Sequence, residues 1–377
     1  MASIDFLRLN PGVLWTLLKK PYWLQILTRR QATWPSYAEV ADWKRNIPSI
    51  RDNGAHVDAS PFYFEWWYFD ATLTGGLTVS IILRLTDSLK PAWKEGSVNV
   101  SVCEKDTPAL RRFIPYGTKY IHASPEMCDV RIGKNCCHME NGVYKVSVEV
   151  PDIRAELTFE STTVAWRPGN GKFRFGHENA FFAWVVPQPR AHVKGSVIIR
   201  GQEKTVDGVG YHDHNWGTVS LLDTVKEWSW GRLHLGDYSC IFADIQLSPR
   251  YGGGRVLPFS LLQGDQVLIS SFLQSNQPLD DGMDFLRNPR SVDFPKGWHL
   301  QWEEPDNHLD VDLETVKVLE KADLLSGNCL RQKIIENLIA HPYYIRCSVT
   351  AKGEWEKEGH TIALEGHGIY EQMSLGR

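Results

Sequence analysis

The densest group of chemically versatile side chains in this chain lies just past its middle, in residues 208–217, where glycines flank a phenol, a carboxyl group, two imidazoles and an amide. In an extended strand, successive side chains point to opposite faces. One face would then carry Tyr211, Asp213 and Asn215, and the other His212 and His214. The first face suits proton transfer and the second suits metal binding, whereas a polar turn between two β-domains is a third interpretation.

Asp213 is the sharper candidate for chemistry. Aromatic neighbours remove water from a carboxyl group and raise its pKa, so that it can hold a proton at neutral pH. Such an acid can protonate a carbon–carbon double bond, and aromatic faces stabilise the resulting cation. The alternative is a structural aspartate that caps a turn or pairs with an arginine such as Arg190. The rings that could surround the acid are those of Trp66, Trp67, Trp184, Trp228 and Trp230.

A metal site would use His212 and His214, with a third ligand from His177, Glu178 or His234. Nothing in the linear sequence fixes that third ligand, so we expect neither a metal nor an organic cofactor. The sequence motifs of zinc proteases, α/β-hydrolases, phosphate loops and dinucleotide-binding sites are absent.

An aromatic run at residues 62–70 and the segment 77–85 are separated by Gly75 and Gly76, which predicts a β-hairpin. Glu65 interrupts this aromatic run. It would either orient a polar group of the central motif across a domain junction or, as is commoner for a strand carboxylate, face solvent.

Further short segments rich in β-branched and aromatic residues follow, separated by turn residues. They are 97–103, 143–150, 154–160, 180–186, 192–200, 227–235, 238–247, 256–262, 267–273, 309–319, 343–352 and 366–373. This pattern favours a sandwich or barrel over alternating βαβ units. Gly252–Gly254 is predicted to be a hairpin turn, and residues 330–339 are predicted to form an amphipathic helix.

The predicted fold is therefore all-β, with two consecutive antiparallel β-sandwich or barrel domains and a few short helices. We expect an N-terminal extension at residues 1–50, a first β-domain at 51–225 and a second, barrel-like domain at 226–377. Residues 6–30 are basic and aromatic, and Pro11 and Pro21 interrupt their apolar runs, so no run spans a bilayer. This segment would dock on the protein or contact a membrane surface.

The composition excludes some partners. With 41 Lys and Arg against 45 Asp and Glu, the chain has no basic excess that would attract nucleic acid. The 15 tryptophans could line a pocket for a hydrophobic small molecule or fill two β cores. The 7 cysteines are scattered without metal-binding spacing, which predicts reduced thiols and a cytoplasmic protein.

Four segments of the chain together resemble a known family. They are residues 65–70, 183–191, 210–217 and 368–371. They resemble the carotenoid 1,2-hydratase (hydroxyneurosporene synthase) family, within a superfamily of two lipocalin-like β-domains that includes fungal Diels–Alderases as more distant members. The resemblance extends from about residue 60 to the end of the chain.

This resemblance implies a two-domain β protein with its pocket at or near the domain junction. It also implies that Asp213 protonates a terminal isoprenoid alkene, with Tyr211 beside it and Trp184 as a pocket wall, and that water traps the cation. One position departs from the family pattern, because Phe182 stands where the hydratases have a histidine. Without that polar group, the cation could instead end by cyclisation or proton loss.

Three hypotheses follow. The first is a cofactor-independent enzyme that acts on a hydrophobic isoprenoid or polyene through Asp213, with Tyr211 and His212 as further catalytic residues. The second is a pericyclase of the Diels–Alderase kind, in which Tyr211, His212 and Asn215 orient or polarise the substrate. The third is a lipocalin-like carrier that binds its ligand unchanged. The predicted substrate contacts are Trp184, Phe182, Glu65, Trp67, Asn215, Trp228 and Trp230.

Overall fold

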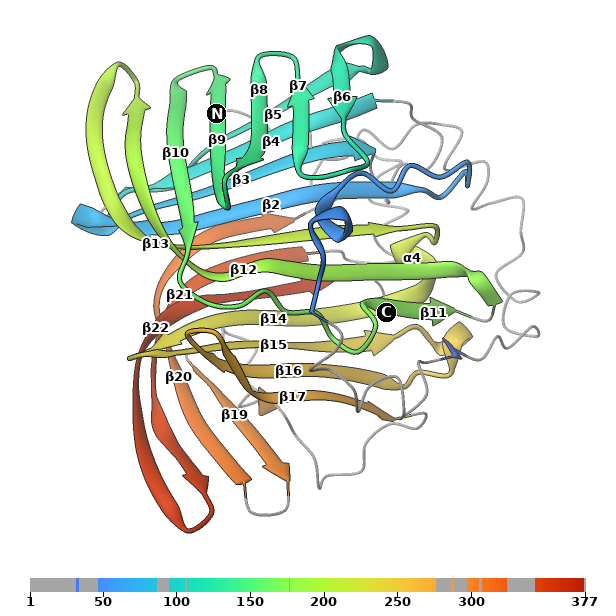
Figure 1. The fold of residues 1–377 in the computed structure, drawn as a ribbon, viewed down its shortest axis with the longest axis vertical. Helices are drawn as coiled ribbons and strands as arrows, with labels where there is room; N and C mark the ends of the chain where they lie inside the picture. Colours follow the sequence, from blue (N-terminus) through green and yellow to red (C-terminus); the bar gives the residue numbers. More distant parts are fainter. Residues whose placement is uncertain are drawn as a thin grey trace. The chain divides into compact units, whose positions relative to one another are not determined.

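A computed structural model describes most of the chain in two compact units, one ending at Leu222 and the other beginning at Asp223. The described residues are 32–33, 47–86, 95–105, 107–175, 177–275, 286–287, 297–304, 307–323 and 343–375. Each unit contains one large, curled antiparallel sheet (Figure 1). The all-β, lipocalin-like prediction is therefore confirmed.

The sheet of the first unit has the strand order β5-β4-β3-β2-β13-β12-β10-β9-β8-β7-β6, with β11 and β1 attached beyond β12. Strands β6–β10 cross over β2–β5, so the sheet folds back on itself (Figure 1). Its elements are β1 (Ala32–Thr33), η2 (Ile50–Asn53), β2 (Phe64–Leu73), η3 (Thr74–Gly76), β3 (Leu77–Thr86), β4 (Glu95–Cys103), β5 (Leu110–Gly117), η4 (Thr118–Tyr120), β6 (Ile121–Ala123), β7 (Asp129–Ile132), β8 (Asn135–Glu140), β9 (Val143–Val150), β10 (Ile153–Ser161), β11 (Lys172–Phe175), β12 (His177–Ile199) and β13 (Gln202–Gly217).

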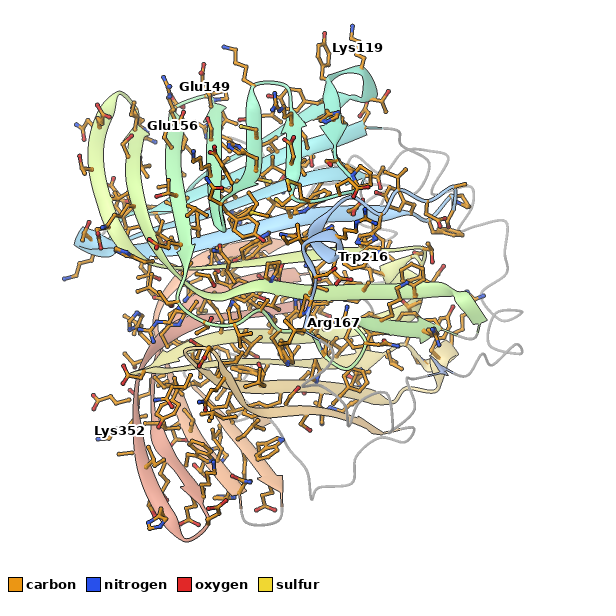
Figure 2. All side chains as sticks on the ribbon, viewed as in Figure 1. Lys119, Glu149, Glu156, Arg167, Trp216 and Lys352 are labelled. Carbon is orange, nitrogen blue, oxygen red and sulfur yellow. The ribbon has the colours of Figure 1, made fainter. Side chains whose placement is uncertain are left out.

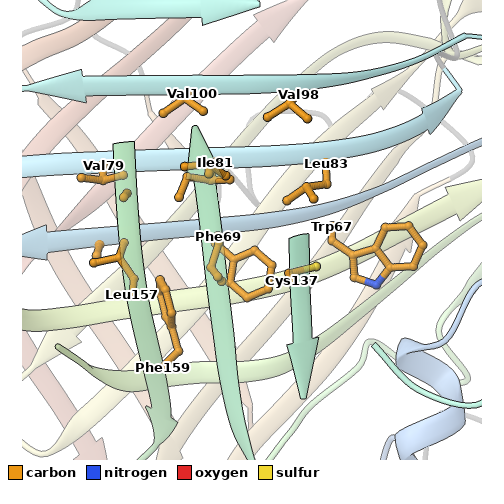
Figure 3. Packing of buried hydrophobic residues seen from close by; sticks show 14 of the residues in the cluster. Trp67, Phe69, Val79, Ile81, Leu83, Val98, Val100, Cys137, Leu157 and Phe159 are labelled. Carbon is orange, nitrogen blue, oxygen red and sulfur yellow. The ribbon is translucent and has the colours of Figure 1, made fainter. Parts of the chain in front are cut away.

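The hydrophobic core of the first unit lies between the crossing strands. Trp67 and Phe69 of β2 point into it, where they meet Ile81 of β3 and Phe159 of β10 (Figure 3). Because side chains alternate along a strand, Trp66, Tyr68 and Asp70 of β2 point to the opposite face of the sheet. The aromatic run therefore supplies both faces of β2.

The second unit has the strand order β17-β16-β15-β14-β22-β21-β20-β19-β18. Its core includes a stacked pair, Phe259 and Trp302, with ring centroids 5.5 Å apart. Its elements are α4 (Leu221–Thr224, at the boundary), β14 (Val225–Leu235), β15 (Tyr238–Leu247), η5 (Pro249–Tyr251), β16 (Arg255–Gln263), β17 (Gln266–Ser275), β18 (Leu286–Arg287), β19 (Gly297–Glu304), β20 (Asn307–Asp323), β21 (Tyr343–Lys357) and β22 (His360–Ser374).

One predicted break in the sheet is wrong. Residues 180–186 and 192–200 were expected to be separate strands, but both belong to the continuous β12. The pairing of β12 with β13 shifts register between Val185 and Gln188 and again between Gln188 and Ala191. Such irregularities accommodate proline, which has no N–H for the ladder, without ending the strand.

Two further predictions can be scored. The central motif is the second half of β13 and not a turn between domains. Gly252 and Gly253 have φ angles of 94° and 67°, so the predicted turn after β15 is confirmed. The helix expected at 330–339 and the extension up to residue 46, apart from 32–33, lie outside the described residues. In the part of the chain that is described, no helix has the length and apolar character needed to cross a membrane.

Candidate active site

The central motif lies in β13, between β2 on one side and β12 on the other. Asp213 is paired with Tyr68 of β2, and Asn215 is paired with Trp66 of β2 and with Trp184 of β12. The predicted alternation of faces is confirmed, because two separate polar networks form on the two sides of the strand. The Asp213 network lies on the face opposite the core of the first unit.

Three donors converge on the Asp213 carboxyl group, which is 6% exposed. Its Oδ2 accepts hydrogen bonds from the Tyr211 hydroxyl at 2.9 Å and from the Trp184 indole Nε1 at 3.2 Å. Its Oδ1 accepts one from Asn215 Nδ2 at 2.8 Å. Trp184, which was expected to be an apolar wall, is therefore also a donor. This arrangement fixes the orientation of the carboxyl group and stabilises negative charge on it.

A second hydroxyl–carboxyl pair lies beside this cluster. The Tyr68 hydroxyl donates to Asp70 Oδ2 at 2.8 Å, and the rings of Tyr68 and Tyr211 meet edge to face at 6.2 Å. Burial, followed by the neighbouring Asp213, raises the pKa of Tyr211 well above its ordinary value. The Tyr211 hydroxyl therefore remains a neutral donor at physiological pH.

Aromatic rings surround the same face. Phe182 lies 5.9 Å from Phe64 and 6.4 Å from Trp66, measured between ring centroids. Phe182 and Trp66 are partly exposed. The face of Asp213 thus combines fixed polar groups with partly exposed aromatic rings, which are features of sites for lipophilic molecules.

His212 lies on the opposite, interior face and stacks on Phe69 at 3.9 Å. Its Nδ1 lies 2.9 Å from the Tyr68 carbonyl oxygen, which can only accept a hydrogen bond, so Nδ1 carries a hydrogen. Its Nε2 lies 3.0 Å from Asn53 Nδ2, which donates to it. Burial lowers the pKa of His212 to about 3, in agreement with a neutral ring. The structure does not bring His212 together with Tyr211 and Asp213.

His214 makes the corresponding contacts further along the strand. Its Nδ1 lies 3.2 Å from the Asp52 carbonyl oxygen, and its Nε2 lies 2.9 Å from Glu65 Oε1. Burial lowers the pKa of His214 to about 3 and raises that of Glu65 to about 7. Both shifts favour a neutral imidazole facing a protonated carboxyl group. His214 and Glu65 therefore share one proton inside the first unit.

Glu65 accepts two further hydrogen bonds, from the His56 backbone N–H at 2.8 Å and from the Tyr63 hydroxyl. It is fully buried, so the expectation of a solvent-facing carboxylate is wrong. It does orient a polar group of the central motif, as the other interpretation predicted, but both residues belong to the first unit. Trp67 stacks on His214 at 4.2 Å, on the face away from Asp213.

The metal interpretation does not fit this geometry, because both ring nitrogens of His212 and of His214 contact protein groups. Nowhere among the described residues do three His, Cys, Asp or Glu side chains come together as a ligand set. Of the suggested third ligands, His234 belongs to the second unit, and the side chains of His177 and Glu178 lie outside the described part.

The loop before β2 supplies residues that the sequence did not identify. The Trp67 indole donates to the Asn53 carbonyl oxygen at 3.1 Å, and the His56 ring stacks on Trp216 at 3.9 Å. Arg167 pairs with Asp52 of η2 at 3.2 Å. Figure 2 draws Arg167 and Trp216 well apart from Glu149 and Glu156. We predicted no site residue in this loop. The surplus of polar side chains just before an aromatic strand was the available signal.

Trp228 and Trp230, also predicted to contact substrate, lie in β14 of the second unit. The predicted site residues therefore fall into three places. Trp184, Phe182 and Asn215 share the face of Asp213; Glu65 and Trp67 lie on the interior face of the first unit; Trp228 and Trp230 lie near another carboxyl group in the second unit.

Comparison with known proteins places this site in a family context. A Diels-Alderase-like family model matches residues 140–287. A protein of Chlorobaculum tepidum named hydroxyneurosporene dehydrogenase is 40% identical over 220 residues, covering 49% of this chain and 56% of the relative. The predicted family resemblance is confirmed. A protein of Emericella nidulans named quinolone epoxide rearrangement protein asqO is 28% identical over 206 residues, covering 50% of this chain and 55% of the relative. The chain spans about half the length of these two curated relatives.

Solved structures share the fold. The crystal structure of CghA with Sch210972 has a TM-score of 0.63 at 13% identity and covers 88% of this chain and 97% of CghA. Kievitone hydratase from Nectria haematococca has a TM-score of 0.54 at 16% identity, with 87% of this chain and 96% of that structure covered. At these identities the solved structures show the fold alone, whereas the names of the two curated relatives are those of catalysts, which supports the prediction of an enzyme.

Proposed function

We propose that this protein is a cofactor-independent enzyme in which Asp213 donates a proton to a carbon–carbon double bond of a lipophilic natural product, such as an isoprenoid or polyene. The cation then cyclises or rearranges and loses a proton, or takes up water and loses a proton from the added oxygen, and Asp213 regains a proton from solvent. The observation that carries the proposal is the convergence of Tyr211, Trp184 and Asn215 on a buried carboxyl group.

The three donors support an acid role for a physical reason. When Asp213 gives up its proton, negative charge develops on its carboxyl group, and donors already aimed at that group stabilise the charge without reorganising. Exclusion of bulk water keeps the proton available for the substrate.

The aromatic residues on this face support the second half of the reaction. A carbocation beside the faces of Trp66 and Phe182 would gain cation–π stabilisation, which is largest where water is excluded. The phenyl ring of Phe182 has no polar group with which to hold a water molecule. Cyclisation or rearrangement is therefore favoured over hydration.

A pericyclase is the second candidate, favoured by the Diels-Alderase-like match, which includes Trp184, Tyr211 and Asn215. In that reaction no proton is transferred. Asn215, whose amide has a second N–H, would polarise a carbonyl group of the substrate and orient the reacting carbons. Tyr211, kept neutral by its raised pKa, would hold Asp213 in place.

The test is an assay of the full chain with two probes, hydroxyneurosporene and an aryl quinolone epoxide, followed by mass spectrometry. Asp213→Asn retains an oxygen for the Tyr211 and Trp184 donors, and the Asn215 amide can turn to accept from the new amide. We expect this variant to fold and to react at least about 100-fold more slowly.

Tyr211→Phe is the matched variant. It removes one donor from Asp213 and leaves the acid in place, so we expect a smaller loss of about 10- to 100-fold. If wild type converts a probe and Asp213→Asn converts it equally fast, acid catalysis by Asp213 is rejected. If neither probe reacts, these two substrate classes are rejected.

A further inference from the structure

The second unit contains a carboxyl group that the proposed function does not use. Glu371 lies in β22, next to Tyr370, whose ring is buried in the core and packs 3.7 Å from the ring of Trp298. Alternation along the strand places Glu371 on the opposite face of the sheet. Unlike Glu65, it keeps part of its side-chain surface accessible to solvent, although desolvation still dominates the environment of its carboxyl group.

Two donors hold the Glu371 carboxyl group. The Tyr344 hydroxyl of β21 donates to Oε2 at 2.7 Å, and the Trp228 side chain of β14 donates a further hydrogen bond. Strands β14, β22 and β21 lie side by side in the sheet (Figure 1). Tyr344, Trp228 and Met373 on this face are partly exposed, which gives the acid apolar and aromatic neighbours.

The charged neighbours of Glu371 act in opposite directions. Arg346 of β21 is its register partner and favours the ionised form, whereas Glu320 of β20 opposes it. Arg232 of β14 shares the same face. Burial outweighs these charges and raises the pKa of Glu371 to about 7. The group is therefore partly protonated at neutral pH and can donate as well as accept a hydrogen bond.

The arrangement repeats the Asp213 cluster in outline, since each carboxyl group accepts from one tryptophan and one tyrosine. The expected chemistry differs. Glu371 has the charged side chains of Arg346 and Glu320 beside it, whereas aromatic rings lie on the face of Asp213. Glu371 suits an oxygen acceptor, which needs only a hydrogen bond or partial proton transfer.

We propose that Glu371, with Tyr344 and Trp228, forms a second ligand-binding site, in which the protonated carboxyl group donates a hydrogen bond to a carbonyl, epoxide or hydroxyl oxygen of a lipophilic molecule. The partly exposed indole of Trp228 packs against the apolar part of that ligand. The site accounts for Trp228 and the adjacent Trp230 as ligand contacts in the second unit. It does not depend on the reaction proposed for Asp213.

The test uses Prodan, a lipophilic fluorescent ketone whose emission reports hydrogen bonding to its carbonyl oxygen, with the full chain. We expect saturable binding that weakens by about tenfold between about pH 6 and about pH 8, because only the protonated fraction of Glu371 donates. Glu371→Gln retains an N–H donor at all pH values. This variant should therefore bind Prodan with an affinity that no longer varies over this range.

Two further variants distinguish this site from the other one. Tyr344→Phe removes a donor that stabilises the ionised carboxyl group, so its binding midpoint should move to higher pH. Asp213→Asn should keep the wild-type pH profile. Three outcomes would each overturn the proposal. They are Prodan binding by wild type that does not vary with pH, the wild-type pH dependence of binding in Glu371→Gln, and loss of that pH dependence in Asp213→Asn. None of these outcomes bears on catalysis by Asp213.

Discussion

Asp213 and Glu65 lie on neighbouring strands of one sheet but on opposite faces, and their contacts give them different tasks. Asp213 accepts from three side chains beside partly exposed rings, as a group that exchanges a proton with a ligand should. Glu65 has 0% exposure and shares a proton with His214, so it can act only on the protein itself. We expect Glu65 to fix the loop before β2 against β13, because it bonds His56 of the loop and His214 of β13.

Glu65 should make stability depend on pH. Its pKa in the folded protein, about 7, is above the ordinary value of 4.5. Below pH 4.5 it is protonated in the folded and unfolded states and contributes no pH dependence. As pH rises from there to about 7, only the unfolded state releases the proton freely, so stability is lost.

The measurement is urea unfolding of wild type and Glu65→Gln at several pH values. The free energy of unfolding of wild type, relative to the variant, should fall by up to about 3 kcal/mol across this window. The lowered pKa of His214 makes the folded protein less stable as pH falls from 6.5 towards about 3. Because His214 is present in both proteins, this contribution is common to both. A difference that stays constant with pH would show that Glu65 is ionised throughout.

The sequence allowed the Asp213 face to be predicted because alternation along a strand is local. It did not allow the Glu65–His214 contact to be predicted, since the two residues are 149 positions apart and meet through the loop and the strand register. For the same reason Trp184 was expected to be a wall, and its N–H donation to Asp213 was missed. Glu371 was noted only as part of a resemblance, because its donors come from two other strands.

At the scale of elements, the close fit of β13 between its neighbours determines where the site lies. A Cβ atom added at Gly210 would lie 2.6 Å from the Asp70 carbonyl oxygen and 2.7 Å from the Phe159 ring. Glycine is therefore needed at position 210 because the β2 backbone and the core side chains lie too close for a Cβ atom, and not because the φ angle is unusual. It sets the spacing between β13 and β2 at which the polar clusters form.

Gly210→Ala should consequently destabilise the first unit by about 1–3 kcal/mol, because the neighbouring backbone and core must move. Gly117→Ala is the matched control, since nothing lies within 4 Å of its added Cβ and its φ is not positive. Thermal unfolding of both variants provides the comparison. Equal midpoints would contradict the packing argument.

The elements were predicted unevenly. Segments with clear alternation, such as 143–150 and 238–247, coincide with β9 and β15. Strands β7 and β8 were missed because their short sequences mix polar residues and cysteines without a clear period. The break expected in β12 was wrong because proline lies at register irregularities there, and a local pattern does not reveal them.

At the scale of the whole molecule, each unit has its own core and its own carboxyl group held by a tryptophan and a tyrosine. Aromatic richness predicted an aromatic-lined site, and the predicted aromatic contacts belong to both units, with Trp184 and Phe182 in the first and Trp228 and Trp230 in the second. The all-β class followed from the spacing of turn residues. We predicted that residues 6–30 of the N-terminal extension dock on the protein or contact a membrane surface. These residues lie outside the described part of the chain, so this stays a prediction.

The central claim is that the proton on Asp213 is transferred to carbon of the substrate. Deuterium content of the product that the full chain forms from hydroxyneurosporene in heavy water tests it most directly, because an epoxide would take its proton on oxygen and leave no label at carbon. We predict one deuterium atom at a product carbon with wild type, and a loss of both product and label with Asp213→Asn. Product formed at the wild-type rate without deuterium at carbon would contradict the account and favour a pericyclic reaction.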